Sequence, residues 1–430
     1  MDINRKTAYY VLTDVESKKS YSNIAINNYI TRLRPNAHSF VREMVYGTLE
    51  NKMLLDHIID QLVPTGSAKL KTSDRIVLRM GIYQLGYMNS VPEYAAVNES
   101  VNLAKKFCKG REGFINASLR AYIREKHRIS LPDRSEDEIR HLSIKYSYEP
   151  WIIELWLEQY DMDFVEELLK AGNCTPPFVI RANWLKIVRE DFIKRLEESG
   201  CIVEKGKLYE DALHIKKGGD FIDSRMYRRG LFSVQDEASM LVAAMLGPRH
   251  GDLVMDVCAA PGGKTMAIAE RMNNKGKIIA SDIYMRKLDQ IQDEAKRLGV
   301  TIVETRSWDA TKTDSEMVEK ADRVLVDAPC SGLGVVRRKP EIKYKKKSRE
   351  MDSLPAKQLQ ILSASSKYVK PGGVIVYSTC TINPDENQRV IDQFLKKNNS
   401  FTKEDAIQLM PNVNGTDGFF ICKMRKAESR

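Results

Sequence analysis

The chain has 430 residues, of which 43% are hydrophobic and 29% are charged, and its formal net charge is +10. This composition is typical of a globular protein with two or three domains. No apolar run reaches the roughly 18 residues that span a bilayer, and the first residues lead into no apolar signal core, so we expect a cytoplasmic protein that does not enter a membrane.

The first third of the chain is predicted to be helical. Apolar residues recur every three or four positions within 40–62 and within 94–107, the second run following Pro92, which suits a helix start. Residues 1–128 hold 20 Lys or Arg against 12 Asp or Glu, so most of the excess positive charge lies here. Such charge favours a nucleic-acid partner, although a solubilising surface would carry it equally well. We predict an all-helical domain over 1–135.

The middle of the chain mixes two periodicities. Helical runs at 151–169 and 189–199 alternate with short apolar runs at 178–181 and 213–215. This alternation predicts a small α+β module over 145–230, after a polar stretch that is typical of a linker.

Strands and helices alternate from about residue 251 onward. The expected strands are 253–257, 277–281, 301–304, 323–326, 374–378 and 419–423, and the expected helices are 265–272, 286–298, 356–369 and 386–397. The pattern predicts an α/β fold over 231–426, a doubly wound, Rossmann-like parallel sheet with helices on both faces. Ligands bind such sheets outside the carboxyl ends of the strands.

A glycine turn follows the first of these strands and precedes a helix. Gly262 and Gly263 allow a tight turn and a close approach of the backbone to a ligand. A phosphate-binding P-loop needs a glycine where this chain has Cys258, and the G-x-G-x-x-G pattern is absent. Asp282 and Asp309 follow the next two strands, where carboxylates can bind a ribose or an adenine amino group, although helix capping would explain either alone. We expect a nucleoside-type cofactor site.

Two cysteines stand in loops after neighbouring strands. Cys330 follows Asp327 in a Pro-Cys-Ser-Gly loop, and Cys380 precedes residues 383–387, which have the features of a helix start. A free thiol has a pKa near ~8.5, so a catalytic cysteine needs nearby donors, cations or a helix N-terminus to become a thiolate. A lone cysteine at a strand end is ordinarily a packed apolar residue. Two of them beside a cofactor loop indicate group transfer through a covalent adduct.

The other cysteines give no such signal. Seven cysteines without C-x-x-C spacing predict neither a disulfide scaffold nor a structural metal site. We expect Cys108, Cys201 and Cys422 to be buried as small apolar side chains.

Three motifs, in this order, resemble the RNA (cytosine-5)-methyltransferase family. They are Asp-Val-Cys-Ala-Ala-Pro-Gly-Gly-Lys-Thr from Asp256, Asp-Ala-Pro-Cys-Ser-Gly-Leu-Gly from Asp327, and Tyr-Ser-Thr-Cys-Thr-Ile-Asn-Pro-Asp-Glu-Asn from Tyr377. The resemblance covers roughly residues 150–426. The helical part is similar to antitermination-factor-like RNA-binding domains through Val45–Leu49 and Phe114–Arg120. The fusion of the two parts resembles the bacterial 16S ribosomal RNA methyltransferases.

The resemblance implies S-adenosylmethionine as cofactor and an unpaired or loop cytosine of 16S rRNA as substrate. It implies that Cys380 attacks C6 of the base, that Cys330 assists product release as a base or by positioning one, and that Asp327 hydrogen-bonds the base edge. The implied cofactor-binding residues are Cys258, Ala259, Ala260, Pro261, Gly262, Gly263, Lys264, Asp282, Asp309 and Asp327. We expect a monomer that holds no metal. The covalent route has a chemical reason, because C5 of cytosine is too weak a nucleophile to take a methyl group unaided.

Two further surfaces are candidates for RNA contact. Residues 337–349 hold eight cations and one acid directly after the Cys330 loop. We predict that this basic run tracks RNA phosphates, although a solvated loop is the usual explanation of such a run. Arg181–Asn183 are a second candidate, with a structural role almost as well supported.

Two alternatives to 16S rRNA methylation stay open. The same loops would serve the same chemistry on tRNA or large-subunit rRNA. A non-catalytic RNA-binding factor would need only the basic helical domain, and the cofactor loop and both thiol loops argue against it.

Overall fold

The computed structural model describes residues 2–18, 20–31, 33–34, 37–217, 225–344 and 349–428. The chain divides into two compact units. The first comprises residues 1–174 and 336–346, and the second comprises 175–335 and 347–430. Among the described helices none combines the length and the apolarity that a membrane crossing requires.

The first unit is built from helices, as predicted. Its α-helices are α1 (Ile3–Lys18), α2 (Ser22–Ile30), α3 (His38–Glu50), α4 (Lys52–Leu62), α5 (Thr72–Tyr87), α6 (Glu93–Phe107), α7 (Glu112–Glu125), α8 (Glu138–Tyr146), α9 (Pro150–Leu157) and α10 (Met162–Gly172), with short turns η2 (Ser67–Lys69) and η4 (Pro340–Tyr344). Buried apolar residues of α1 to α7 form one core. The single helix expected over 151–169 is two, because Asp161 accepts a hydrogen bond from Phe164 N at 2.8 Å and starts α10.

The second unit contains a small antiparallel sheet with strand order β2-β3-β1-β4. Its elements are β1 (Phe178–Ala182), α11 (Arg189–Glu198), β2 (Ile202–Lys205), β3 (Ala212–Lys217), α12 (Arg225–Arg228) and β4 (Phe232–Val234). The apolar runs at 178–181 and 213–215 are its central strands, β1 and β3. The sequence did not predict β2 and β4, which are only four and three residues long.

A seven-stranded sheet of order β10-β11-β9-β8-β5-β6-β7 forms the larger part of the second unit. Its strands are β5 (Leu253–Asp256), β6 (Lys277–Asp282), β7 (Val303–Ser307), β8 (Ala321–Asp327), β9 (Val369–Thr379), β10 (Phe401–Leu409) and β11 (Phe419–Lys426). The expectation of a wholly parallel sheet is wrong at one edge, because β11 runs antiparallel to both β9 and β10. The five strands from β9 to β7 are parallel, as predicted.

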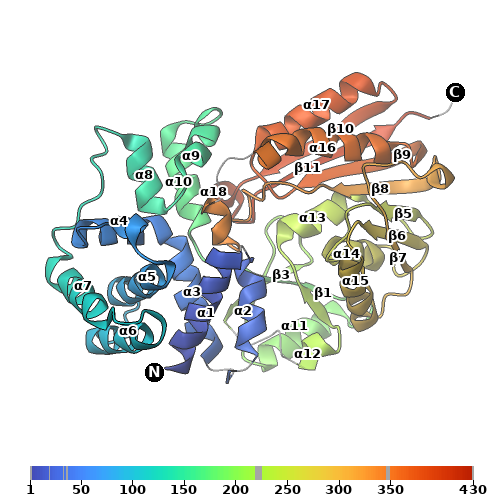
Figure 1. Cartoon of the computed structure of the whole chain (residues 1–430). Coiled ribbons are helices and arrows are strands. Elements are labelled where there is room, and N and C mark those ends of the chain that lie inside the picture. Colours follow the sequence, from blue (N-terminus) through green and yellow to red (C-terminus); the bar gives the residue numbers. More distant parts are fainter. Residues whose placement is uncertain are drawn as a thin grey trace. The chain divides into compact units, whose positions relative to one another are not determined.

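Helices cover both faces of this sheet (Figure 1). The α-helices and short turns are α13 (Glu237–Leu246), α14 (Gly263–Arg271), α15 (Met285–Leu298), η3 (Ser315–Met317), α16 (Arg349–Ser366), η5 (Pro384–Glu386), α17 (Gln388–Lys397) and α18 (Pro411–Asn414). Val254 of β5 packs with α13, α14 and α15, whereas the next residue, Met255, packs with α16 and α17. The alternation along one strand therefore builds two cores, which is the doubly wound arrangement that the sequence predicts.

Candidate active site

The three motif loops lie at the carboxyl ends of three neighbouring strands. β5 pairs with β8, and β8 pairs with β9, all in parallel. The register sets Asp256 beside Leu325 and Asp327 beside Ser378. The loops that leave β5, β8 and β9 therefore start at one edge of the sheet, where ligands bind in folds of this class.

The two thiols of these loops face each other. The Sγ atoms of Cys330 and Cys380 are 3.1 Å apart, and both side chains are partly buried. The loops are also joined by Gly334 N, which donates to Cys380 O at 3.0 Å. The hydrogen bond with Cys380 and then burial raise the pKa of Cys330 well above its ordinary value. The raised pKa favours the protonated form of Cys330, although either sulfur can be the donor at this distance.

An ammonium group lies beside this pair. Lys264 Nζ donates to Asp327 Oδ2 at 2.8 Å, and Ser378 Oγ donates to the other oxygen, Oδ1, at 2.8 Å. Burial disfavours the charged lysine, but the negative charges of Asp327 and of a Cys380 thiolate outweigh it, so the pKa of Lys264 lies above its ordinary value. Lys264 therefore brings a positive charge close enough to Cys380 to interact with it, which is a feature that nucleophilic cysteines need.

The expected helix start after Cys380 is different in the structure. Residues 384–386 form the short turn η5, and α17 begins only at Gln388. The side chain of Asn383 accepts from Asp385 N at 3.1 Å, so an amide of that turn is already used. The positive charge near Cys380 therefore comes from Lys264 and not from a helix dipole. The sequence indicates Lys264 only as a cofactor-binding residue.

The turn between β5 and α14 suits a nucleoside cofactor. Gly262 has a φ of 103°, and a Cβ there would come within 3.3 Å of Ile291. Among the described residues no side chain caps the start of α14 at Gly263. Asp256 ends β5 fully buried, and it accepts from Thr265 Oγ1 at 2.7 Å. An open glycine turn and an uncapped helix start leave backbone amides for a polar ligand. The residues of this turn therefore fit a nucleoside-type cofactor such as S-adenosylmethionine.

The remaining residues of this turn hold its shape. Ala259 N donates to Ser281 O at 2.9 Å, and Gly262 N donates to Ala259 O at 2.7 Å. Burial raises the pKa of Cys258, so that thiol stays neutral. Ala260 and Pro261 lie between these two hydrogen-bonded points. The turn is therefore fixed by its own backbone and by β6.

The two carboxylates predicted to bind the cofactor also bond locally. Asp282 accepts from Tyr284 N at 3.0 Å, and Asp309 accepts from Thr311 N at 3.1 Å and Thr311 Oγ1 at 2.7 Å. The hydrogen bonds from Thr311 lower the pKa of Asp309. These bonds close local turns and are not helix caps, because the N-cap of α15 is Tyr284 and no described helix starts at Asp309. Three exposed apolar residues, Ile283, Tyr284 and Met285, follow Asp282, and the sequence did not single them out.

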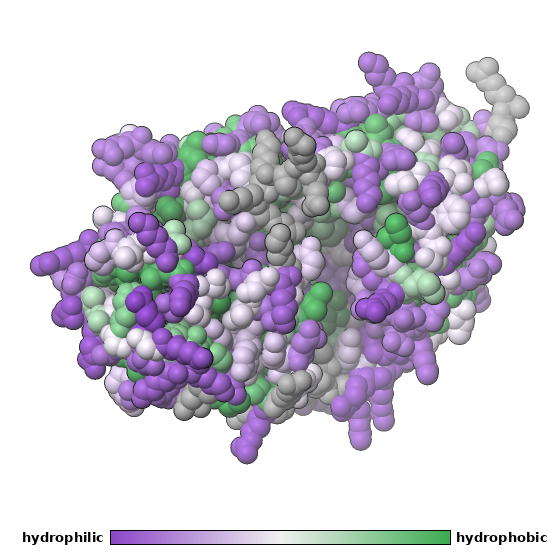
Figure 2. Space-filling view, in the orientation of Figure 1, coloured by the Kyte–Doolittle hydropathy of each residue, from purple (hydrophilic) through white to green (hydrophobic). Residues whose placement is uncertain are grey.

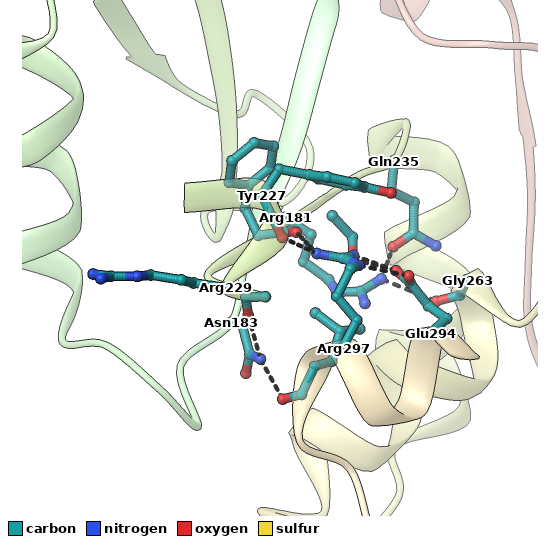
Figure 3. Close-up of polar contacts among 12 residues, drawn as sticks. Arg181, Asn183, Tyr227, Arg229, Gln235, Gly263, Glu294 and Arg297 are labelled. Carbon is teal, nitrogen blue, oxygen red and sulfur yellow. Dashed lines mark hydrogen bonds and ion pairs between the residues drawn. The ribbon is translucent and has the colours of Figure 1, made fainter. Parts of the chain in front are cut away.

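Arg181 and Asn183 have a structural role and are not placed to contact RNA. Arg181 is 4% exposed; it pairs with Glu270 at 2.9 Å and donates to Gly263 O at 2.9 Å (Figure 3). Asn183 is fully buried and donates to Gly230 O and Leu298 O at 2.9 and 2.8 Å. Neither side chain is available to RNA. Arg181 instead fastens β1 to the start of α14.

The predicted phosphate-tracking role of the basic run is wrong for at least two of its cations. Arg337 is 6% exposed and Lys343 is completely buried. Lys343 Nζ donates to Glu50 O, Tyr146 O and Asn173 Oδ1 at 2.8, 3.1 and 2.7 Å, all within the first unit. Tyr344 OH donates to Leu49 O. Residues 345–348 of the run lie outside the described residues.

Comparison with known proteins decides the family. Family models match three parts of the chain: the NusB family at residues 2–124, the Methyltr_RsmF/B-like, ferredoxin-like domain at 148–221, and the 16S rRNA methyltransferase RsmB/F at 243–425. A Bacillus subtilis (strain 168) protein named "Probable ribosomal RNA small subunit methyltransferase B" is 37% identical over 443 residues, which cover 98% of each chain. The chain belongs to the 16S rRNA methyltransferase RsmB/F family. The predicted resemblance to the bacterial 16S ribosomal RNA methyltransferases is confirmed.

One further relative and one solved structure are also similar to this chain over most of its length. The ribosomal RNA small subunit methyltransferase B of Vibrio cholerae is 32% identical over 92% of this chain and 91% of its own length. A crystal structure of PH0851 superposes with a TM-score of 0.82 at 26% identity, over 99% of this chain and 100% of the other. Family membership places the chain among the methyltransferases of ribosomal RNA.

Proposed function

We propose that this protein transfers a methyl group from S-adenosylmethionine to C5 of a cytosine in 16S rRNA, through a covalent bond between Cys380 and C6 of the base. The observation that carries the proposal is the pair of sulfurs 3.1 Å apart at neighbouring strand ends, with the ammonium of Lys264 beside them. The names of the relatives supply the substrate class.

The Cys380 thiolate begins the reaction. Its lone pair forms the S–C6 bond, and the displaced π electrons make C5 nucleophilic. Bound S-adenosylmethionine would supply an electrophilic methyl group: as C5 bonds to it, the methyl–sulfur bond breaks and S-adenosylhomocysteine is left. A base then takes the C5 proton, the electron pair restores the C5–C6 double bond, and the S–C6 bond breaks to free Cys380. Lys264 stabilises the sulfur while it is an anion, at the start and at the end.

Cys330 and Asp327 assist in different ways. Because its pKa is raised, Cys330 keeps a proton that it can donate toward the departing sulfur of Cys380. A thiol that keeps its proton is a poor base. The surroundings of Cys330 therefore favour a role as hydrogen-bond donor over a role as base. Asp327, held by Lys264 and Ser378, binds the base edge.

The cofactor and the RNA would be held by different parts of the chain. The backbone from Cys258 to Lys264, with Asp282 for the ribose and Asp309 for the adenine, would hold S-adenosylmethionine. The helical domain over 1–135 and the α+β module over 145–230 would hold RNA, which presents the cytosine unstacked at a cost of a few kcal/mol.

Mapping 5-methylcytosine in cellular RNA tests this function. Cells without the gene should lack one or more 5-methylcytosines of 16S rRNA, and the gene should restore them. Cys380→Ala should not restore them, while the variant protein still binds S-adenosylmethionine in a titration. Restoration by Cys380→Ala removes this residue as nucleophile, and loss of the mark from tRNA or large-subunit rRNA instead would change the substrate.

A further inference from the structure

A buried carboxylate joins the two thiol loops. Glu386 of η5 is 1% exposed. Its Oε2 accepts from Ser331 N at 2.9 Å, and Ser331 directly follows Cys330. Its Oε1 accepts from Asn383 Nδ2 at 3.0 Å, and Asn383 lies in the loop that begins at Cys380. Each oxygen of one side chain therefore holds one of the two loops.

The sheet and a covering helix hold Glu386 itself. Tyr377 OH, on β9, donates to Glu386 O at 2.6 Å. Gln358 of α16 is fully buried, and its Nε2 donates both to Glu386 Oε2 and to Pro329 O, each at 2.9 Å. A buried carboxylate is costly unless donors surround it, and here the donors come from the two loops and from α16. Without this carboxylate, Ser331 N, Asn383 Nδ2 and Gln358 Nε2 would have no common acceptor.

The charge of Glu386 also distinguishes the two sulfurs. The groups that act on the Cys330 thiol are Cys380, with which it shares a hydrogen bond, and the carboxylate of Glu386, both of which disfavour ionisation of Cys330. On the other side of the pair, Lys264 and its partner Asp327 lie near Cys380. These surroundings favour a proton on Cys330, and in the proposed mechanism the negative charge is on Cys380.

We propose that Glu386 is a positioning residue that holds Cys330 against Cys380 for the release of methylated RNA. The proposal rests on the proposed function, because release is the step in which both sulfurs take part: the S–C6 bond breaks and Cys330 donates to the freed Cys380 sulfur. A displacement of about 1 Å at such a pair costs on the order of 100-fold in rate.

Single-turnover kinetics with the full-length protein, transcribed 16S rRNA and S-adenosylmethionine would test it. Adduct formation is followed as a shifted band on a denaturing gel, and release as free methylated RNA. Glu386→Gln keeps the side-chain length but replaces one acceptor oxygen with an NH₂ group. We expect it to form the adduct within about 3-fold of the normal rate and to release RNA roughly 10- to 100-fold more slowly. Asp385→Asn is the matched control, because Asp385 of the same turn is 43% exposed and pairs with Arg389.

The double variant Glu386→Gln/Cys330→Ala separates positioning from a general loss of structure. If Glu386 acts through Cys330, the double variant should release RNA no more slowly than Cys330→Ala alone. Normal release by Glu386→Gln, or a double variant whose defects multiply, would overturn the proposal.

Two further measurements keep the test decisive. If Glu386→Gln does not give a normal thermal transition, the variant Gln358→Met is used instead. It removes a donor to Glu386 and to Pro329 O but leaves the carboxylate in place, and we expect it to slow the release of RNA as well. Normal release by Gln358→Met would overturn the proposal. An unaltered protein that forms no adduct, or an adduct that persists in Cys380→Ala, would contradict the proposed function instead.

Discussion

Two cysteines with the same intrinsic chemistry have different surroundings at this site. The hydrogen bond with Cys380, burial and the charge of Glu386 raise the pKa of Cys330, whereas Cys380 lies near the ammonium of Lys264. Divergent environments of this kind are how proteins assign different roles to identical groups. The sequence motifs place both thiols at strand ends. The charges that make their surroundings different belong to Lys264 and Glu386, which lie 66 positions before Cys330 and 56 positions after it.

Replacing Cys330 should trap the reaction after methyl transfer. Cys330→Ala removes the donor to the departing sulfur, so we expect a covalent RNA adduct to accumulate and release to slow by roughly 10²- to 10⁴-fold. A denaturing gel with labelled RNA measures this. Cys174→Ala, at an exposed cysteine, should accumulate no more adduct than the unaltered protein, and the absence of a shifted band with Cys330→Ala would count against the release role.

Asp256 should make stability depend on pH. Burial raises its pKa to about 7 in the folded protein, from roughly 3.9 when unfolded. The folded state then binds more protons between these values, so this contribution is complete below about pH 4 and is lost as pH rises through about 7. We expect the free energy of unfolding of the normal protein, relative to Asp256→Asn, to fall by up to roughly 4 kcal/mol between about pH 4 and pH 8. Urea titrations measure this difference, and one that does not change with pH would contradict it.

At the scale of elements, Arg181 fastens β1 of the small sheet to both ends of α14, by a hydrogen bond to Gly263 O at its start and a buried ion pair with Glu270 in its last turn. Arg181 and Glu270 are 5% and 8% exposed at their side chains, and Arg181 also donates to Gly263 O (Figure 3). Gly263 belongs to the turn that we propose holds the cofactor. The small sheet therefore supports the turn from outside the larger sheet.

Breaking this pair should destabilise the second unit. Arg181→Met leaves the buried carboxylate of Glu270 without its partner, which costs about 3–5 kcal/mol. Urea unfolding should show this loss, and titration with S-adenosylmethionine should show weaker binding, because Gly263 loses a donor. Arg228→Met, at an exposed cation of α12, should change stability by less than about 0.5 kcal/mol. Equal stability of the two variants would contradict the structural role of Arg181.

Local patterns predict the elements of this chain better than they predict its polar partners. The strands expected at 253–257 and 323–326 are β5 and β8, because buried parallel strands are continuous apolar runs. β10 was not predicted, because five consecutive residues, Thr402 to Ala406, are exposed and mostly polar. Arg181 and Lys343 resemble surface cations in sequence, and they are buried because Glu270 and Glu50 O, 89 and 293 positions away, accept from them.

At the scale of the whole molecule, most of the excess positive charge lies in residues 1–128, which belong to the first unit. Many of its cations are exposed on α6 and α7, where hydrophilic side chains are frequent on the visible face (Figure 2). Binding to phosphates through such side chains releases counterions and depends on salt. RNA affinity should therefore respond to these positions more than to isolated charges elsewhere.

Removing three of these cations should weaken RNA binding and its salt dependence together. We expect Lys105→Gln/Lys106→Gln/Arg120→Gln to lower the slope of log affinity against log salt by about 1 for each phosphate that the variant no longer neutralises. Lys396→Gln/Lys397→Gln, at exposed lysines of α17, is the comparison and should change the slope less. Fluorescence anisotropy with 16S rRNA fragments measures both, and an unchanged slope in the triple variant would leave the helical domain without its proposed role.

The division of the chain into units also has a consequence for biosynthesis. The carbonyls of Leu49, Glu50 and Tyr146 receive their donors from Lys343 and Tyr344, which leave the ribosome long after the helices that need them. At about 5–20 residues per second, the roughly 170 residues that follow position 174 take roughly ten to thirty seconds to translate. During that interval the nascent helical bundle lacks its last internal turn, and a truncated polypeptide that stops at 174 should melt below the temperature of the same helices in the finished protein.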